Sequence, residues 1–255
     1  MQITLIQGIL LTIMVFLFAW DARWEAFFVF RPIVVAFFTG AILGDVTLGL
    51  KAGAIAELAY LGLLTVGGTV PPNPLIAGLM TTVLAYKNGI SVEAALGLSL
   101  PFALLMQWTV IACQSLFSGF NVYLDKYSQE GNFKKFSFFI FLPEFILTGL
   151  YALIAFLSVY ALQDSITLFV NSFPEFIIRG FDIAGGILPG VGLGLLLKVM
   201  VKKENVAYLV IGFLLMTFMG FSNVLPVALA GMAVAFISFL ADTNKKSEVN
   251  TNDGI

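Results

Sequence analysis

Three long apolar segments constrain this chain more than any other feature of its sequence. They cover residues 94–117, 136–162 and 182–200, and each is long enough to cross the roughly 30 Å hydrocarbon core of a bilayer as a helix. Hydrophobic residues make up 60% of the 255 positions and charged residues 11%, whereas a soluble domain carries about 25% charged residues. The sequence therefore predicts an all-α, polytopic integral membrane protein surrounded by membrane lipid.

The first ninety residues have a different pattern. Their apolar pieces, at residues 27–43, 52–66 and 75–85, are short and interrupted by glycine, proline and charge. Irregular backbone at membrane depth is tolerated only where it is buried in protein or lines a cavity, and such interrupted pieces point to a transporter binding site. We therefore expect broken or re-entrant helices in residues 1–90, the substrate region of one membrane domain that spans residues 1–240.

Basic residues indicate how the chain crosses the membrane. Residues 167–179 are amphipathic, so we expect a helix along the membrane surface there. With that helix lying flat, the chain places three lysine clusters on one side, which the positive-inside rule makes the cytoplasm. The clusters are Lys126, Lys134 and Lys135; Lys198, Lys202 and Lys203; and Lys245 and Lys246. The polar tail at residues 241–255 is expected to be disordered and cytoplasmic.

Several classes of chemistry are excluded by composition. The chain has no histidine and one cysteine, Cys113, so histidine-dependent catalysis, histidine metal sites and an internal disulfide are absent. The net charge is −2 and the sequence shows no stripe of basic residues, so nucleic acid is not an expected partner. No catalytic residue, metal site or cofactor is predicted.

Glu57 is the main candidate for a functional group. It lies inside the apolar run GAIAELAYLG at residues 53–62, and an ionisable residue in such a segment marks a functional site by default. The alternative is a structural carboxylate that accepts hydrogen bonds from backbone amides or an arginine. The segment GGTVPPNP follows at residues 67–74, where prolines remove backbone donors. Thr65, Thr69 and Asn73 are therefore candidates to face a cavity and bind sugar hydroxyls, although a simple surface turn explains the same pattern.

Two further polar residues are candidates for substrate contact. Gln107 lies in the middle of a predicted span, where its amide needs a partner that is either another helix or the substrate. Arg31 precedes Pro32 between two apolar pieces, and a turn at the membrane interface is the favoured explanation for it.

The order of these motifs resembles a known family. Arg31-Pro32, GAILGD at residues 40–45, GAIAELAYLG at 53–62, Pro72-Asn73 and FDIAGG at 181–186 occur in sequence. This closely resembles the IIC membrane component of the mannose/fructose/sorbose family of the bacterial phosphoenolpyruvate-dependent sugar phosphotransferase system. The resemblance covers roughly residues 1–240.

The resemblance implies a function and partners. It implies a sugar-transporting subunit in the bacterial cytoplasmic membrane, paired with the membrane subunit IID in a trimer of IIC–IID units that moves sugar by an elevator mechanism. The phosphocarrier proteins IIA and IIB would carry the phosphoryl group on histidines, so the phosphoryl-transferring residues would lie outside this chain. Glu57 matches the family's acidic position, Asn73 stands where some members have aspartate, and Thr65 stands where the mannose-type sequence has asparagine.

The sequence leaves the identity of the substrate open. Mannose, glucose, fructose, sorbose and N-acetylated amino sugars all fit the resemblance. An ion-coupled secondary transporter of a small polar solute, with Glu57 as its ion site, explains the same carboxylate beside a broken helix. A membrane scaffold subunit explains the hydrophobic mass but gives no reason for the carboxylate.

Overall fold

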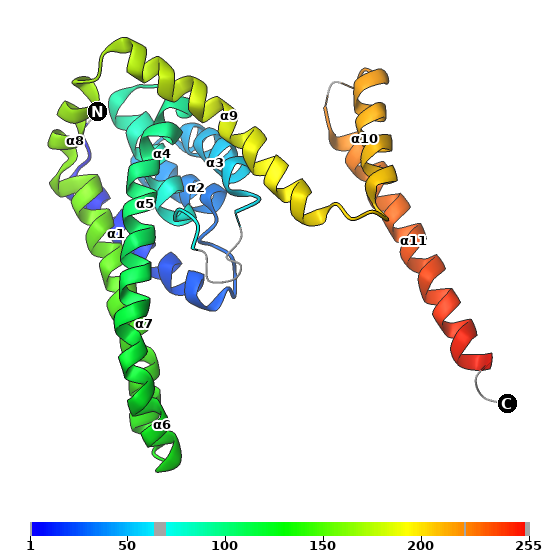
Figure 1. Ribbon diagram of the computed structural model, residues 1–255. Helices are drawn as coiled ribbons and strands as arrows, with labels where there is room; N and C mark the ends of the chain where they lie inside the picture. The colour runs from blue at the N-terminus through cyan, green and yellow to red at the C-terminus, as the bar shows by residue number, and fades with distance from the viewer. Residues whose placement is uncertain (1, 64–69, 222, 253–255) are drawn as a thin grey trace. The chain divides into compact units, whose positions relative to one another are not determined.

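The computed structural model describes residues 2–63, 70–221 and 223–252, with side chains through residue 240, and this part of the chain contains helices and no strand (Figure 1). In chain order the elements are α1 Leu5–Trp24, α2 Pro32–Leu43, α3 Val46–Tyr60, α4 Pro74–Asn88, α5 Val92–Phe117, η1 Ser118–Phe120, α6 Asn121–Gln129, α7 Phe133–Phe156, η2 Leu157–Ala161, α8 Gln163–Asn171, α9 Glu175–Met200, α10 Val206–Phe218 and α11 Leu225–Asn252. The expected all-α class is confirmed.

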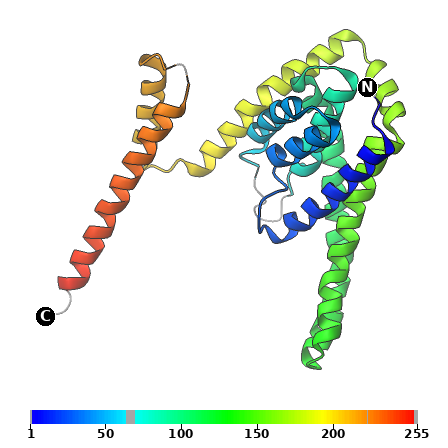
Figure 2. The ribbon, with the colours of Figure 1, turned by 180° about the vertical axis from the view of Figure 1, so that it is seen from behind.

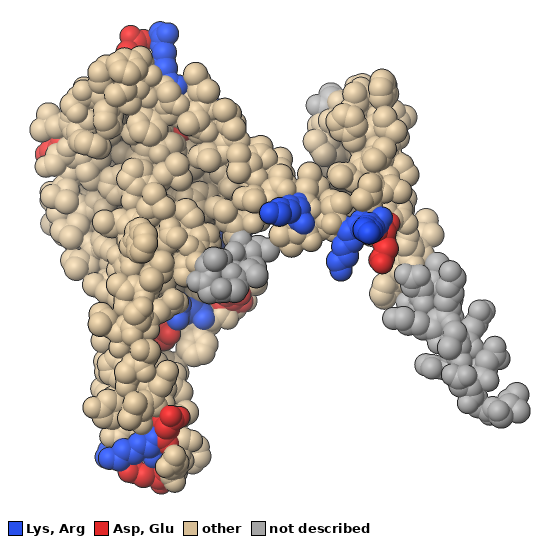
Figure 3. Space-filling model, viewed as in Figure 1, with Lys and Arg blue, Asp and Glu red and all other residues tan. Residues whose placement is uncertain are grey.

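Among the described residues, four helical stretches are long and apolar enough to cross a membrane. They are Leu5–Trp24, Val92–Gln129, Phe133–Ala161 and Glu175–Met200. The last three contain the long segments expected from hydropathy, and the first shows that the apolar N-terminus forms a helix of spanning length. On the face drawn in Figure 3, charged side chains gather in a few places, such as the tip formed by α6 and α7, and most of the surface between them is uncharged.

The core is built from helices that are too short to span. α2, α3 and α4 contain 12, 15 and 15 residues, which gives lengths of about 18–23 Å at 1.5 Å per residue. α4 lies at the centre, and its residues from Leu75 to Ala85 are all buried. Thr81 and Thr82 tolerate this burial because their hydroxyls donate to carbonyls one turn earlier, at 2.7 and 2.9 Å.

Proline and glycine set the ends of these short helices. α2 begins at Pro32 and α4 begins at Pro74, where the missing backbone donor costs nothing. Gly44 ends α2 with a φ of 90°, a conformation that glycine adopts without strain. Asp45 then caps α3 by accepting a hydrogen bond from the amide of Leu48 at 2.9 Å, so α2 and α3 form a helical hairpin.

Close helix packing depends on glycine at particular positions of α3 and α9. A Cβ added at Gly49 would lie 2.5 Å from the carbonyl oxygen of Ala36 on α2, and one added at Gly192 would lie 2.0 Å from the carbonyl oxygen of Leu58 on α3. Both distances are shorter than a side chain allows. Glycine therefore lets α2 and α9 approach α3 at backbone contact distance.

α1 packs along α7, as the view in Figure 2 shows from behind. Arg23 near the end of α1 forms an ion pair with Glu144 on α7, with its Nε 2.6 Å from Oε2 and its Nη2 3.2 Å from Oε1. Aromatic rings support the contact, since Trp20 stacks on Phe141 with centroids 6.3 Å apart. Helices far apart in the sequence are thus joined by both charge and ring packing.

Element boundaries differ from expectation in the second half of the chain. Residues 167–179 do not form one helix: α8 ends at Asn171 and α9 begins at Glu175, because Pro174 disfavours helix in the residue before it. α11 continues through Asn252, because extending an existing helix costs less than starting one, and the disorder of the tail at residues 241–255 stays a prediction. A surface position for the residue 167–179 segment stays a prediction.

The described chain divides into two compact units. One comprises Met1–Leu196 and the other Leu197–Ile255. The second unit contains the helical hairpin of α10 and α11. That both units form one membrane domain over residues 1–240 remains a prediction.

Candidate functional site

Arg31 and Glu57 meet at one end of the α2–α3 hairpin. Arg31 is the residue that precedes α2, and its Nε donates to Oε1 of Glu57 at 2.8 Å while its Nη2 bonds the same oxygen. The backbone amide of Ile33, in the first turn of α2, donates to Oε2 of Glu57 at 3.3 Å. The carboxylate therefore faces both a guanidinium and the positive end of a helix, two partners that attract a negative charge.

This geometry is the one expected for a structural carboxylate, yet both side chains of the pair remain partly exposed to solvent. The side chains of Arg31 and Glu57 are 24% and 17% exposed. A carboxylate has about four lone-pair sites, and the contacts to Arg31 and Ile33 occupy three. Glu57 therefore has capacity for about one more hydrogen bond without giving up its partners.

Asn73 organises the start of α4. Its Oδ1 accepts a hydrogen bond from the amide of Ile76 at 3.0 Å, which caps the helix. Its Nδ2 donates to the hydroxyl of Tyr151 on α7 at 2.6 Å, and its backbone amide donates to the carbonyl of Ala103 on α5 at 3.1 Å. Asn73 thus attaches the beginning of α4 to both α5 and α7.

Gln107 holds the segment just before Asn73. Its Nε2 donates to the backbone carbonyl of Val70, so this interior amide meets the interrupted backbone and not a neighbouring helix. Its Oε1 is buried and has no hydrogen-bond partner among the described residues. Thr65 and Thr69, the remaining candidates, lie outside the described residues.

The candidate residues form two groups. Arg31 and Glu57 bond to each other, while Asn73 and Gln107 both hold the segment from Val70 to Asn73 against α5. No hydrogen bond joins the two groups within the described part of the chain. The structure also adds Tyr151, which sequence analysis missed because nothing in the sequence connects it to a residue 78 positions earlier.

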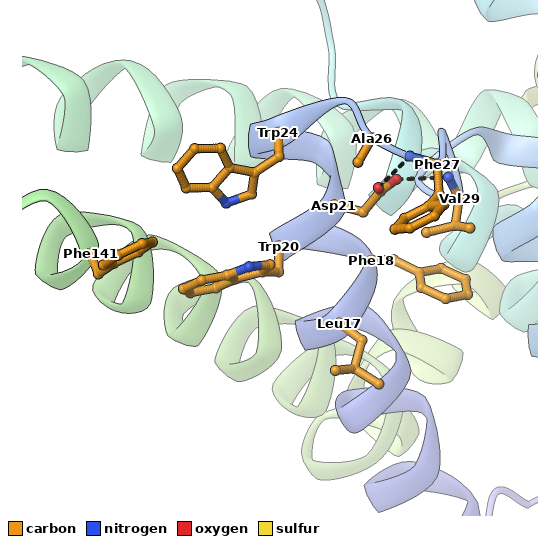
Figure 4. Close-up of a pocket in the computed structure, with 9 residues that line it drawn as sticks. All are labelled: Leu17, Phe18, Trp20, Asp21, Trp24, Ala26, Phe27, Val29 and Phe141. Atoms are coloured by element: carbon orange, nitrogen blue, oxygen red, sulfur yellow. Dashed lines mark hydrogen bonds between the residues drawn. The ribbon is translucent and has the colours of Figure 1, made fainter. Parts of the chain in front are cut away.

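A separate apolar pocket of about 580 Å³ lies near the end of α1 (Figure 4). Trp20, Trp24 and Phe27 contribute to its lining with Phe141 of α7. Its buried carboxylate, Asp21, accepts hydrogen bonds from the amides of Phe27 and Val29, both at 2.8 Å, and so shapes the loop after α1. None of the candidate substrate-binding residues lines this pocket.

Metal chemistry finds no support in the described residues. Residues 2–63, 70–221 and 223–252 contain no group of three or more histidine, cysteine, aspartate or glutamate side chains arranged to hold an ion. The polar groups that the structure brings together are hydrogen-bond donors and acceptors.

Comparison with known proteins identifies relatives over nearly the whole chain. The chain is 45% identical to N-acetylgalactosamine permease IIC component 1 of Escherichia coli K12 over 238 residues, which cover 93% of this chain and 89% of that protein. It is 26% identical to the mannose-specific EIIC component of the same organism, over 96% of this chain and 93% of the relative. The sorbose-specific EIIC component of Klebsiella pneumoniae is also 26% identical, over 93% of this chain and 89% of the relative.

Solved structures share the fold. One described only as a membrane protein superposes with a TM-score of 0.83 at 25% identity, over 94% of this chain and 97% of the other. A mannose transporter in complex with microcin E492 gives a TM-score of 0.59 at 25% identity, with the same coverage. The family model for the sorbose-specific IIC component of the phosphotransferase system matches residues 5–237. The resemblance in the sequence motifs is thus confirmed, and the chain belongs to the sorbose-specific IIC family of phosphotransferase-system membrane components.

Proposed function

We propose that this sugar-permease subunit carries an N-acetylated amino sugar, with N-acetylgalactosamine as the first candidate. The observation that supports this choice is the 45% identity to a relative named as an N-acetylgalactosamine permease component, against 26% to the mannose- and sorbose-specific relatives. Because the aligned region extends over 93% of the chain, it covers the positions of both groups of candidate residues.

The sugar would bind where the core helices are interrupted. The Arg31–Glu57 pair offers a charged donor and one remaining carboxylate acceptor site, which form the stronger, charge-assisted hydrogen bonds. Asn73 and Gln107 hold the Val70–Asn73 segment in place, and Thr65 and Thr69 are proposed to add hydroxyls. A neutral sugar loses its hydration on entry, so each unmatched hydroxyl costs about 1–3 kcal/mol.

Members of this family work with other subunits of the phosphotransferase system. For this chain we propose the membrane subunit IID as direct partner, in a trimer of IIC–IID units, with IIA and IIB supplying the phosphoryl group. The chain contains no histidine, which agrees with a division of labour in which it carries sugar and other subunits carry phosphate.

The proposed transport cycle is an elevator movement in the bacterial cytoplasmic membrane. The short helices α2, α3 and α4 with the first half of α5 would form the moving core, because they pack tightly on one another. α1 and α7, joined by the Arg23–Glu144 pair, would belong to the static part. The three lysine clusters support a cytoplasmic position for the C-terminal tail.

The test is uptake by cells that lack this gene. Cells expressing the chain with its partner subunits should take up labelled N-acetylgalactosamine, accumulate it as a sugar phosphate, require phosphoenolpyruvate and continue briefly after an uncoupler is added. Mannose, sorbose and fructose serve as comparison substrates. Accumulation of unmodified sugar that stops when the ion gradient collapses would refute the assignment in favour of an ion-coupled carrier.

A further inference from the structure

Within the described part of the chain, two buried polar atoms, one on α3 and one on α5, lack a hydrogen-bond partner. They are the hydroxyl of Tyr60, the last residue of α3, and Oε1 of Gln107 on α5. Tyr60 is only 2% exposed. Leaving a buried donor or acceptor unpaired is costly, so each such group in a folded protein needs an explanation.

Both atoms belong to the surroundings of the same short stretch of backbone. Tyr60 lies in a buried cluster that includes Ala103 of α5, and the carbonyl of Ala103 accepts a hydrogen bond from the amide of Asn73. Gln107 is one helical turn beyond Ala103 and donates to the carbonyl of Val70. Tyr60 therefore shares a buried cluster with the α5 residue that bonds Asn73, and Gln107 bonds the other end of the same segment.

The chemistry of these atoms selects the kind of ligand. A tyrosine hydroxyl donates and accepts, and an amide oxygen accepts, so together they match a hydroxyl-bearing molecule. A metal ion requires more oxygen ligands than this pair provides. An apolar ligand would leave both atoms unpaired, and an anion would meet the amide oxygen unfavourably.

We propose that Tyr60 is a substrate-contact residue whose hydroxyl bonds to the carried sugar, and that Gln107 accepts from a sugar hydroxyl through Oε1. This inference rests on the proposed function and adds a residue to its site. Because Tyr60 is almost fully buried, the structure shows a state in which this part of the site is shut. The cluster around Tyr60 includes Leu188 of α9, so sugar reaches the hydroxyl in a state in which these neighbours have separated.

The decisive variant is Tyr60→Phe, which keeps the ring and removes only the hydroxyl. Labelled N-acetylgalactosamine uptake would be measured in cells, with the unlabelled sugar and its singly deoxygenated derivatives as competitors. We expect the KM of the variant to rise about tenfold, as for a site that loses one hydrogen bond to its substrate. One deoxy derivative should compete about tenfold less well than the parent sugar against the wild-type protein, and equally well against the variant.

Thermal unfolding of the purified IIC complex separates a binding role from a structural one. Removing an unpaired buried hydroxyl should leave the melting temperature unchanged or raise it, whereas removing a structural hydrogen bond would lower it. Tyr160→Phe is the matched control, because Tyr160 lies in η2 and its ring packs against Gly8 of α1, and this variant should take up sugar normally.

The outcomes distinguish this inference from the proposed function. Where the wild-type protein takes up a different sugar of the panel, the competition series is run with that sugar. Wild-type uptake with identical competition ratios for the wild type and Tyr60→Phe would overturn the role of Tyr60 and leave the proposed function standing. A wild-type complex that takes up no sugar of the panel would overturn both.

Discussion

Replacing the two members of the Arg31–Glu57 pair, singly and together, tests whether this pair binds sugar or only holds α2 against α3. Glu57→Gln keeps the shape of the side chain and removes its charge. It leaves the Arg31 guanidinium, 24% exposed, without its charged partner. Arg31→Gln makes the reciprocal change, and the double variant replaces the ion pair with two neutral amides.

The expected loss of stability follows from burial. Breaking a buried ion pair costs about 3–5 kcal/mol, whereas a fully exposed pair contributes roughly 0–1 kcal/mol. Side-chain exposures of 24% and 17% lie between these cases, so each single variant should lose about 2 kcal/mol. The double variant should recover most of this loss, because it leaves no uncompensated charge and its two amides can bond to each other.

Uptake should respond differently from stability if the pair contacts the sugar. The single variants and the double variant should then all take up labelled sugar at least tenfold more slowly, while the protein level in the membrane stays near normal. Glu175→Gln is the control, since the Arg179–Glu175 pair is 75% and 82% exposed and should contribute little.

Two results would refute this reasoning. Normal uptake by Glu57→Gln would remove Glu57 from the sugar site. Recovery of both melting temperature and uptake in the double variant would show that the pair only holds α2 against α3.

Further predictions concern packing and the cap of α4. Gly192→Ala would place a Cβ 2.0 Å from a carbonyl oxygen of α3 and should lower the stability of the fold by about 1–3 kcal/mol. Gly190→Ala in the same helix meets no atom within 4 Å and should be tolerated. Thermal unfolding compares the two variants. Asn73→Ala removes both the cap of α4 and the bond to Tyr151 and should lose about 2–3 kcal/mol, against about 1 kcal/mol for Tyr151→Phe, which removes only the second bond. Equal losses for these two variants would contradict the capping role of Asn73.

Much of the fold could be predicted from local sequence. Mean hydropathy over long windows locates spanning helices without knowledge of their neighbours, which is why the helices Val92–Phe117 and Phe133–Phe156 were expected nearly at their observed positions. The breaks at Gly44 and Pro74 follow from backbone chemistry in the same local way. By contrast, the π-helical turn Leu157–Ala161 has no marker in the sequence.

The candidate site was harder to predict because its contacts join distant residues. The sequence showed that a lone carboxylate at position 57 would be costly, but it did not identify Arg31 as the partner. A signal was present: Arg31 and Glu57 both lie thirteen residues from Gly44, the turn of the α2–α3 hairpin, and an antiparallel hairpin brings such residues together. No comparable symmetry connects Asn73 to Tyr151, so that contact could come only from the three-dimensional structure.

The geometry also bears on how tightly such a subunit can bind its sugar. Glu57 and Asn73 both form hydrogen bonds with other residues of the chain. The sugar therefore adds to a network that already holds the short helices together. The groups left for the sugar among the described candidates are few: one acceptor site on Glu57, the Tyr60 hydroxyl and Oε1 of Gln107. Few strong contacts imply modest affinity, because binding must also offset the lost hydration and freedom of the ligand. Modest affinity suits a carrier whose sugar is phosphorylated by another subunit. Phosphorylation, and not tight binding, then prevents the sugar from returning across the membrane.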